Sequence, residues 1–356
     1  MYKRQTSVFL FIIFASILIN YLVYINYTKY ILEEAGDLSR VSYDLSYKNY
    51  KRNTIVDDIT FKIIEGTNYS LNYSPEIITF GDSFMNGSCE KTWLQNYINR
   101  DVVHLHAIIT PDNIMTILNQ IKDNPPKYFI IERIERGLYK TFLKVDFNNM
   151  FYKKGFETIL DNKKVLRDGD ESIKYFKFLN NANLKFFIKN ILDFDIDNFY
   201  LLQLKSILFN ISGVKKLLAN NSFFTVEPDK LFFSNDDYKS EYLSDLQLNK
   251  IVNQFEFLNK TLELYGTKLI VLVVPDKLTL YGKYLKIPIK STFYNNLLSK
   301  LEENGVKAVN ILEVLEEKLF SVKDIYQPDD THFSRKGAVI VGKGISEYLN
   351  KLEGSD

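Results

Sequence analysis

Short apolar strands alternate with amphipathic helices over two stretches of this chain, and this order is the strongest constraint on its fold. The first stretch, residues 76–131, reads strand, helix, strand, helix, strand. The second, residues 243–350, adds strands at 268–275 and 306–312, each flanked by helical patterns. Strands connected by helices pair in parallel, with helices on both faces. The sequence therefore predicts a three-layer α/β/α domain over residues 76–350.

Two segments do not follow this alternation. Residues 138–240 hold long aromatic-rich stretches such as "NLKFFIKNILDF", and we expect them to form a helical insertion over the sheet. Residues 29–75 are polar and rich in tyrosine with weak periodicity, which predicts a stalk leading into the domain.

The first 28 residues predict a membrane anchor. Lys3 and Arg4 precede an uncharged apolar run at 7–25, close to the ~20 residues that a helix needs to cross a bilayer. The run is too long for a typical signal peptide, and no small-residue cleavage site follows it. A buried soluble helix is the other alternative, but no polar face repeats at helical spacing. The positive-inside rule predicts a single-pass cell-membrane protein with a cytoplasmic N-terminus and a periplasmic or extracellular C-terminal domain.

The charge balance and the single cysteine exclude other classes. A net charge of +1 gives no basic footprint for nucleic acid, so no nucleic-acid partner is expected. Cys89 has no second cysteine to pair with, so the outer domain must be held together by its core rather than by a disulfide.

The apolar run at 76–80 ends abruptly in Gly-Asp-Ser, and this turn is the first candidate site. The carboxyl edge of a parallel sheet is where α/β folds place their sites. Ser83 would stand there beside the N–H groups of a following helix, an arrangement that suits a nucleophile with donors for an oxyanion. The alternative is an ordinary helix cap, because Asp and Ser are favoured at that position.

A nucleophilic serine requires a base, and His332 is the best placed of the three histidines. His104 and His106 share one face of a predicted strand, which is typical of sheet packing. His332 follows Asp329 and Asp330 in a polar turn before the last helix. A carboxylate this close can orient the imidazole and stabilise its charged form, although such a turn can also be a solvated loop. The histidines and carboxylates lack metal-ligand spacing, so neither a metal nor a cofactor is expected.

Taken together, these residues resemble the SGNH (GDSL-type) hydrolase superfamily. "ITFGDSF" at 78–84 and "DDTHFSRKGA" at 329–338 carry the resemblance. "YFIIERIERGLY" at 128–139 and "LIVLVVPDKLTLYGKYL" at 269–285 are similar to the group that contains alginate O-acetyltransferase-like proteins and other envelope polysaccharide acetyltransferases. The resemblance covers roughly 76–137 and 243–350, and it implies a flavodoxin-like SGNH fold.

The resemblance also implies roles for the candidate residues. Ser83 would be the nucleophile and His332 the general base. The superfamily pattern Asp-x-x-His points to Asp329 as the acid, whereas the Asp-Thr-His variant of the group points to Asp330. In this chain the serine precedes the histidine, as in the general superfamily and unlike that group.

Oxyanion and substrate contacts are less well defined. The Gly and Asn that the superfamily uses as oxyanion donors have no counterpart here, which leaves the backbone N–H of Ser83. Arg133 or Arg136 could replace them, unless both arginines only pair with the neighbouring glutamates. Lys277 and Tyr281 lie in the resembling strand-end segment and are candidate substrate contacts, with ordinary loop polarity as the alternative.

The expected function is a membrane-anchored, extracytoplasmic serine acyltransferase that O-acetylates an envelope or exopolysaccharide through an acyl-Ser83 intermediate. The resemblance implies a multi-spanning membrane acyltransferase as the acyl donor. An esterase acting on the same substrates is the first alternative. A catalytically inactive polysaccharide-binding or scaffold protein is the second, motivated by the missing Gly and Asn.

Overall fold

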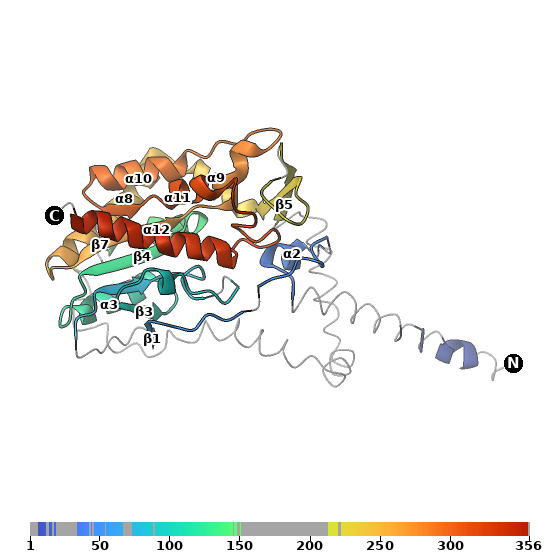
Figure 1. Cartoon of the computed structure of the whole chain (residues 1–356), viewed down its shortest axis with the longest axis horizontal. Helices are drawn as coiled ribbons and strands as arrows, with labels where there is room; N and C mark the ends of the chain where they lie inside the picture. The colour runs from blue at the N-terminus through green and yellow to red at the C-terminus, as the bar shows by residue number, and fades with distance from the viewer. Residues whose placement is uncertain are drawn as a thin grey trace.

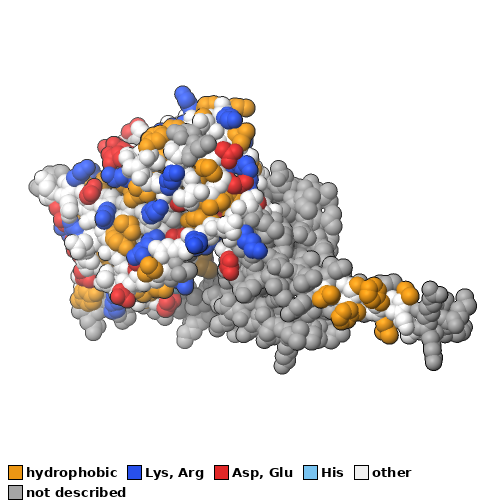
Figure 2. Space-filling model, turned by 45° about the vertical axis from the view of Figure 1, so that its right-hand side comes forward, with side chains coloured by type: hydrophobic (Ala, Val, Ile, Leu, Met, Phe, Trp, Pro, Cys, Tyr) orange, Lys and Arg blue, Asp and Glu red, His pale blue; other side chains and the backbone are white. Residues whose placement is uncertain are grey.

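The computed structural model describes residues 6–11, 14, 15, 18, 34–42, 44, 46–53, 55–66, 73–87, 90–144, 146, 147, 150, 213–219 and 222–354. Much of the predicted membrane span and residues 151–212 of the predicted insertion lie outside these ranges. Among the described residues, no helix combines the length and apolarity needed to cross a membrane. Large apolar side chains at positions 8–11, 14 and 18 are exposed, and they lie on a segment that projects from the body (Figure 2).

A six-stranded parallel sheet forms the centre of the body (Figure 1). The strand order is β1-β3-β2-β4-β7-β8, and each neighbouring pair is parallel. Without β1, the remaining five strands follow the flavodoxin-like order 2-1-3-4-5 in chain sequence. Their bounds are β1 Lys62–Glu65, β2 Ile77–Phe80, β3 Val102–His106, β4 Tyr128–Ile134, β7 Lys268–Val274 and β8 Lys307–Val309.

The central strands are apolar throughout because both faces of the sheet are covered. β2 and residues 269–274 of β7 are buried without interruption, as expected for a parallel sheet between helical layers. α8 packs on β7 and α10, while α12 packs on α11 and on a short 3-10 helix, η3. The helices are α3 Pro111–Ile121, α8 Asp245–Glu263, α9 Lys277–Tyr281, α10 Phe293–Glu303, α11 Ile311–Lys318 and α12 Arg335–Gly354, and η3 spans Leu94–Tyr97.

Local sequence signals set the helix ends. Ser244 and Gln247 form a reciprocal capping box at the start of α8. Gly266, at a φ of 76°, follows its end in the left-handed conformation that glycine tolerates. The other predicted strands and the predicted helices of the second stretch are confirmed, but the strand predicted over 306–312 ends at Val309, because Asn310 caps α11. The helix predicted between the first two strands, over 90–100, is only η3. Glu90, Lys91 and Asn99 have positive φ angles on both sides of it and prevent its extension.

The prediction of an all-helical insertion over about 138–240 is wrong for residues 213–234. These residues form two antiparallel strands, β5 Gly213–Leu217 and β6 Lys230–Ser234. Phe232 of this hairpin stacks on Tyr47 with ring centroids 5.6 Å apart. Contact with an aromatic ring distant in sequence thus stabilises strands that the local pattern did not reveal.

The prediction of a stalk over 29–75 is wrong for the described residues between 34 and 66. A short helix, α2 Asp37–Ser42, contacts β5 and β6, and β1 extends the sheet by pairing with β3. Leu38, Tyr47 and Phe232 form a small separate hydrophobic cluster that holds this segment to the hairpin. The folded body therefore begins well before residue 76.

Close approach of α12 to η3 generates a stability prediction. A Cβ built at Gly342 would collide with the carbonyl oxygen of Leu94 and lie 2.8 Å from the Cβ of Tyr97. We expect Gly342→Ala to lower the free energy of unfolding by about 1–3 kcal/mol, measured by urea denaturation, because overpacking outweighs the gain in helix propensity. Gly354→Ala in the same helix meets open space and serves as the control. Equal stability of the two variants would contradict this packing argument.

Candidate active site

The turn after β2 carries Ser83 and is clamped to the end of β4. These neighbouring strands mark the point where the strand order reverses, the usual site position in such sheets. Gly81 permits the approach, since a Cβ there would lie 2.5 Å from Glu132 Oε2. The backbone N–H of Asp82 donates to that same oxygen at 2.7 Å. The Asp82 carboxylate accepts from the backbone N–H groups of Phe84 at 3.1 Å and Ile134 at 3.2 Å.

His332 reaches this turn from the loop between α11 and α12. Its Nε2 lies 2.6 Å from Ser83 Oγ, although the two residues are 249 positions apart in the chain. Its Nδ1 lies 2.7 Å from Asp330 Oδ1, so the ring is oriented by a carboxylate on one side and faces a hydroxyl on the other. The Phe84 ring packs against the imidazole with centroids 4.8 Å apart. This is the spatial order of a Ser-His-Asp triad.

The two candidate acids occupy different positions. Asp330 Oδ1 also accepts from the backbone N–H of His332 at 3.0 Å, which fixes the carboxylate against its own turn. Asp329 faces the N-terminal segment instead, where it accepts from the backbone N–H of Gly36 at 2.9 Å and from Arg52 at 2.5 Å. Of the two carboxylates that the sequence left as alternatives, Asp330 is the one that lies at the imidazole.

The environment of the imidazole favours its protonated form. Burial by itself disfavours an imidazolium, but the charge and hydrogen bond of Asp330 outweigh it and raise the pKa of His332 above its usual 6.5. The reciprocal effect on Asp330 overcomes the penalty of burial and lowers the pKa of that carboxyl. A base of raised pKa beside a hydroxyl at hydrogen-bond distance is suited to accept the hydroxyl proton.

The two arginines at the end of β4 differ in their partners. Arg133 NH1 donates to Asp82 Oδ2 at 3.2 Å, next to the serine turn. Its Nε is buried and has no hydrogen-bond partner among the described residues. Arg136 forms ion pairs with Asp276 and Asp237, and its backbone N–H donates to Asp276 at 2.9 Å. Both arginines therefore pair with aspartates rather than with the neighbouring glutamates.

The structure corrects the substrate-contact role predicted for Lys277 and Tyr281, because both side chains are fully buried. Lys277 Nζ donates to the carbonyl oxygens of Gln327 at 2.9 Å, Pro328 at 3.1 Å and Asp330 at 3.2 Å. Burial lowers the pKa of Lys277 to about 8 despite nearby carboxylates. Tyr281 packs between aromatic rings. Lys277 is thus a tether for the loop that carries His332.

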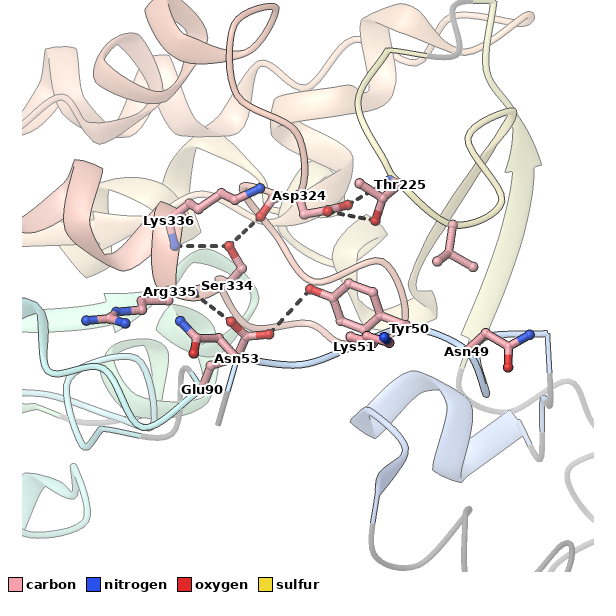
Figure 3. A pocket seen from close by; sticks show the side chains of 11 residues that line it. Asn49, Tyr50, Lys51, Asn53, Glu90, Thr225, Asp324, Ser334, Arg335 and Lys336 are labelled. Carbon is pink, nitrogen blue, oxygen red and sulfur yellow. Dashed lines mark hydrogen bonds between the residues drawn. The ribbon is translucent and has the colours of Figure 1, made fainter. Parts of the chain in front are cut away.

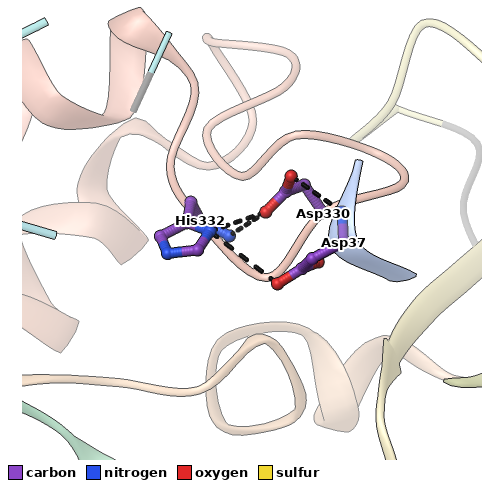
Figure 4. A group of neighbouring side chains, drawn as sticks. All are labelled: Asp37, Asp330 and His332. Carbon is purple, nitrogen blue, oxygen red and sulfur yellow. Dashed lines mark hydrogen bonds and ion pairs between the residues drawn. The ribbon is translucent and has the colours of Figure 1, made fainter. Parts of the chain in front are cut away.

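Sequence reasoning missed Asp37, which the structure places beside the triad (Figure 4). Its carboxylate accepts from the backbone N–H of Thr331 at 2.7 Å and from the Thr331 hydroxyl. The ligand-type atoms of Asp37, Asp330 and His332 lie within 4.8 Å of one another. We do not assign them as metal ligands, because His332 Nδ1 lies at hydrogen-bond distance from Asp330 and the Asp37 oxygens accept from Thr331.

A pocket of about 440 Å³ adjoins the chain immediately after His332 (Figure 3). It opens between the N-terminal segment, the β5–β6 connection and the first residues of α12. Most of its lining residues carry a polar or charged side chain, and Tyr50 adds one aromatic ring. The lining residues are Asn49, Tyr50, Lys51, Asn53, Glu90, Thr225, Val226, Asp324, Ser334, Arg335 and Lys336.

Comparison with known proteins identifies one family. Residues 226–356 match the model of the SGNH hydrolase-like domain, acetyltransferase AlgX. The matched part contains Asp330 and His332, whereas Ser83 lies outside it. The resemblance inferred from the sequence is thereby confirmed, and the sheet described above is an SGNH-like α/β fold. No curated protein and no solved structure matches the chain significantly.

The tether by Lys277 predicts a stability loss on substitution. Lys277→Met leaves three buried carbonyl oxygens without their donor, and each unmade hydrogen bond costs roughly 1–3 kcal/mol. We expect the free energy of unfolding to fall by about 2–4 kcal/mol in urea denaturation, after partial relaxation. Lys283→Met removes an exposed ion pair with Glu316 and is the matched control, expected to cost less than about 1 kcal/mol. Similar losses for both lysines would refute the tether.

Proposed function

We propose that this chain is a serine O-acyltransferase that works through an acyl-Ser83 intermediate, because residues 226–356 match the model of the SGNH hydrolase-like domain, acetyltransferase AlgX. The observation that carries the proposal is the 2.6 Å contact between Ser83 Oγ and His332 Nε2, backed by Asp330 at 2.7 Å from Nδ1. Ser83 comes from the turn after β2, whereas Asp330 and His332 share the turn before α12, and the three groups lie in the order that nucleophilic catalysis requires.

In the proposed first step, His332 Nε2 takes the proton of Ser83 as the Oγ attacks the carbonyl carbon of an acyl ester. The tetrahedral adduct collapses, and the leaving alcohol receives that proton from His332. An acyl ester on Ser83 remains. His332 then deprotonates the acceptor hydroxyl, which attacks this ester, and Ser83 regains the proton as it leaves. Asp330 keeps Nδ1 protonated and stabilises the transient imidazolium.

We assign oxyanion stabilisation to the backbone N–H of Ser83 and to Arg133. The guanidinium of Arg133 is partly exposed and is anchored beside the serine turn through Asp82. A cation held there supplies the kind of donor that the missing Asn would provide. Arg136 is committed to Asp276 and Asp237, so it is not assigned this role.

The proposed acceptor is an envelope polysaccharide or exopolysaccharide. The pocket that follows His332 supports this, because hydrogen-bonding side chains surround one tyrosine ring, a composition suited to sugar hydroxyls and a sugar face. The apolar run near the N-terminus supports an anchored enzyme with its catalytic domain outside the cell. The family resemblance supports a multi-spanning membrane acyltransferase as the source of the acyl groups. Water as acceptor would make the chain an esterase, and the partial exposure of His332, 19%, favours that as the second candidate.

Covalent labelling of the full-length chain tests this proposal. A fluorophosphonate should label the wild type, and both Ser83→Ala and His332→Ala should abolish labelling. Asp330→Asn should slow labelling by roughly 10²–10⁴-fold, because the imidazole loses its orienting charge. Asp329→Asn is the matched control and should slow labelling by less than about tenfold, since Asp329 contacts Arg52 and not the imidazole.

A second experiment separates a transferase from an esterase. A transferase should move acetyl from a labelled donor to an oligosaccharide, whereas an esterase should release it to water as acetate.

Failure of the folded wild type to label would contradict an enzymatic role, as would labelling that survives in Ser83→Ala. The first result would favour a binding or scaffold protein with the same fold.

The raised pKa of His332 predicts the pH dependence of labelling. Only the neutral imidazole can accept the Ser83 proton, so the rate should fall as the pH drops through the pKa of His332 in the folded chain. Because Asp330 raises that pKa above 6.5, the midpoint of the acid limb should also lie above 6.5. Labelling rates measured over a pH series check this. A midpoint below 6.5 would show that burial dominates over the carboxylate.

A further inference from the structure

We propose that Asp37 is a positioning residue for His332: it fixes the Asp330–Thr331–His332 turn and sets a second carboxylate beside the imidazole. The inference rests on the proposed function, because it concerns the base of that same reaction. It adds a residue that neither the family match, which begins at residue 226, nor the sequence patterns assign.

Asp37 and the turn bind each other through three hydrogen bonds. Its carboxylate accepts from the Thr331 backbone N–H at 2.7 Å and from the Thr331 hydroxyl. In return, the backbone N–H of Asp37 donates to Asp330 Oδ2 at 3.0 Å, the oxygen that does not face the imidazole. Asp37 Oδ2 itself lies 3.8 Å from His332 Nδ1. Asp37 therefore holds Thr331 through its side chain and Asp330 through its backbone N–H, and it places a carboxylate beside His332 (Figure 4).

The segment around Asp37 is fixed independently of these bonds. A Cβ at Gly36 would collide with the carbonyl oxygen of Asp329, so glycine is required for this approach. Arg52 donates to the Asp329 carboxylate from the other end of the segment. Lys215 of the hairpin pairs with Asp44 at 2.5 Å, beside the Tyr47–Phe232 stack. Asp37 therefore acts on His332 from a rigid support rather than from a loose leader.

The charge of Asp37 adds to this placement. The carboxylates that act on the imidazole come from three elements: Asp330 in its own turn, Asp82 after β2 and Asp37 in α2. Four cations of the described part of the chain lie near these carboxylates, namely Arg52, Lys277, Arg136 and Arg133, the last paired with Asp82 at 3.2 Å. Removing the charge of Asp37 while retaining its acceptor oxygen should leave the turn in place and make His332 a weaker base.

The test compares labelling of the full-length wild type, Asp37→Asn and Asp37→Ala by a fluorophosphonate over a pH series. Asp37→Asn should keep the plateau rate within about threefold and move the midpoint of the acid limb down by about half a unit or more. Asp37→Ala also loses the anchor of Thr331, so its plateau rate should fall by about tenfold or more. Glu256→Gln, a partly exposed carboxylate of α8 that pairs with Lys260 outside this segment, should change neither quantity.

An unchanged midpoint in Asp37→Asn, together with an unchanged plateau in Asp37→Ala, would overturn the inference. An NMR titration of the His332 imidazole in the wild type and Asp37→Asn measures the same pKa difference without catalysis. Absence of labelling in the wild type would overturn the proposed function instead, and the titration would still decide whether Asp37 acts on His332. Asp37→Asn covers the case in which Asp37→Ala fails to fold.

Discussion

The contact between Ser83 and His332 joins the two halves of the chain, and much of the structure serves to maintain it. Ser83 is held from the sheet side, where the glycine turn lies on the end of β4. His332 is held by a loop with little regular structure of its own. That loop keeps its shape because the buried ammonium of Lys277 collects three of its carbonyl oxygens. One cation at the end of β7 thus converts an irregular connection into a rigid support, as the burial of its carbonyl groups demands.

Several carboxyl groups are buried beneath this site, and raised pKa values keep two of them from adding their negative charge to the cluster. Glu132 is fully buried under the serine turn, and burial followed by the charge of Asp82 raises its pKa well above the usual value. Glu135 is buried beside Asp276, and burial followed by the charge of Asp276 raises the pKa of Glu135 to about 8. Its oxygens accept from the Asp276 backbone N–H at 3.0 Å and the Thr279 hydroxyl at 2.7 Å. These acids join β4 to the start of α9 as hydrogen-bonding groups rather than as clustered charges.

Sequence reasoning succeeded where a local pattern determines the structure and failed where a distant contact does. The buried strands and the long amphipathic helices carry their periodicity in their own residues, and Ser83 and His332 stand out by their chemistry. The choice between Asp329 and Asp330 depends on which carboxylate the folded turn brings to the imidazole, and no local pattern contains that information. Lys277 looked like a surface contact because a buried lysine has no sequence signature. Asp37 lies 293 positions from its partner Asp330, so its role emerges only from the folded chain.

The order of these parts along the chain has a further consequence. Ser83 precedes His332 by 249 positions, so the ribosome releases the nucleophile well before the base. A nascent chain therefore carries the serine hydroxyl without its base until His332 has been synthesised. The serine gains its base only when the loop between α11 and α12 docks against the turn after β2.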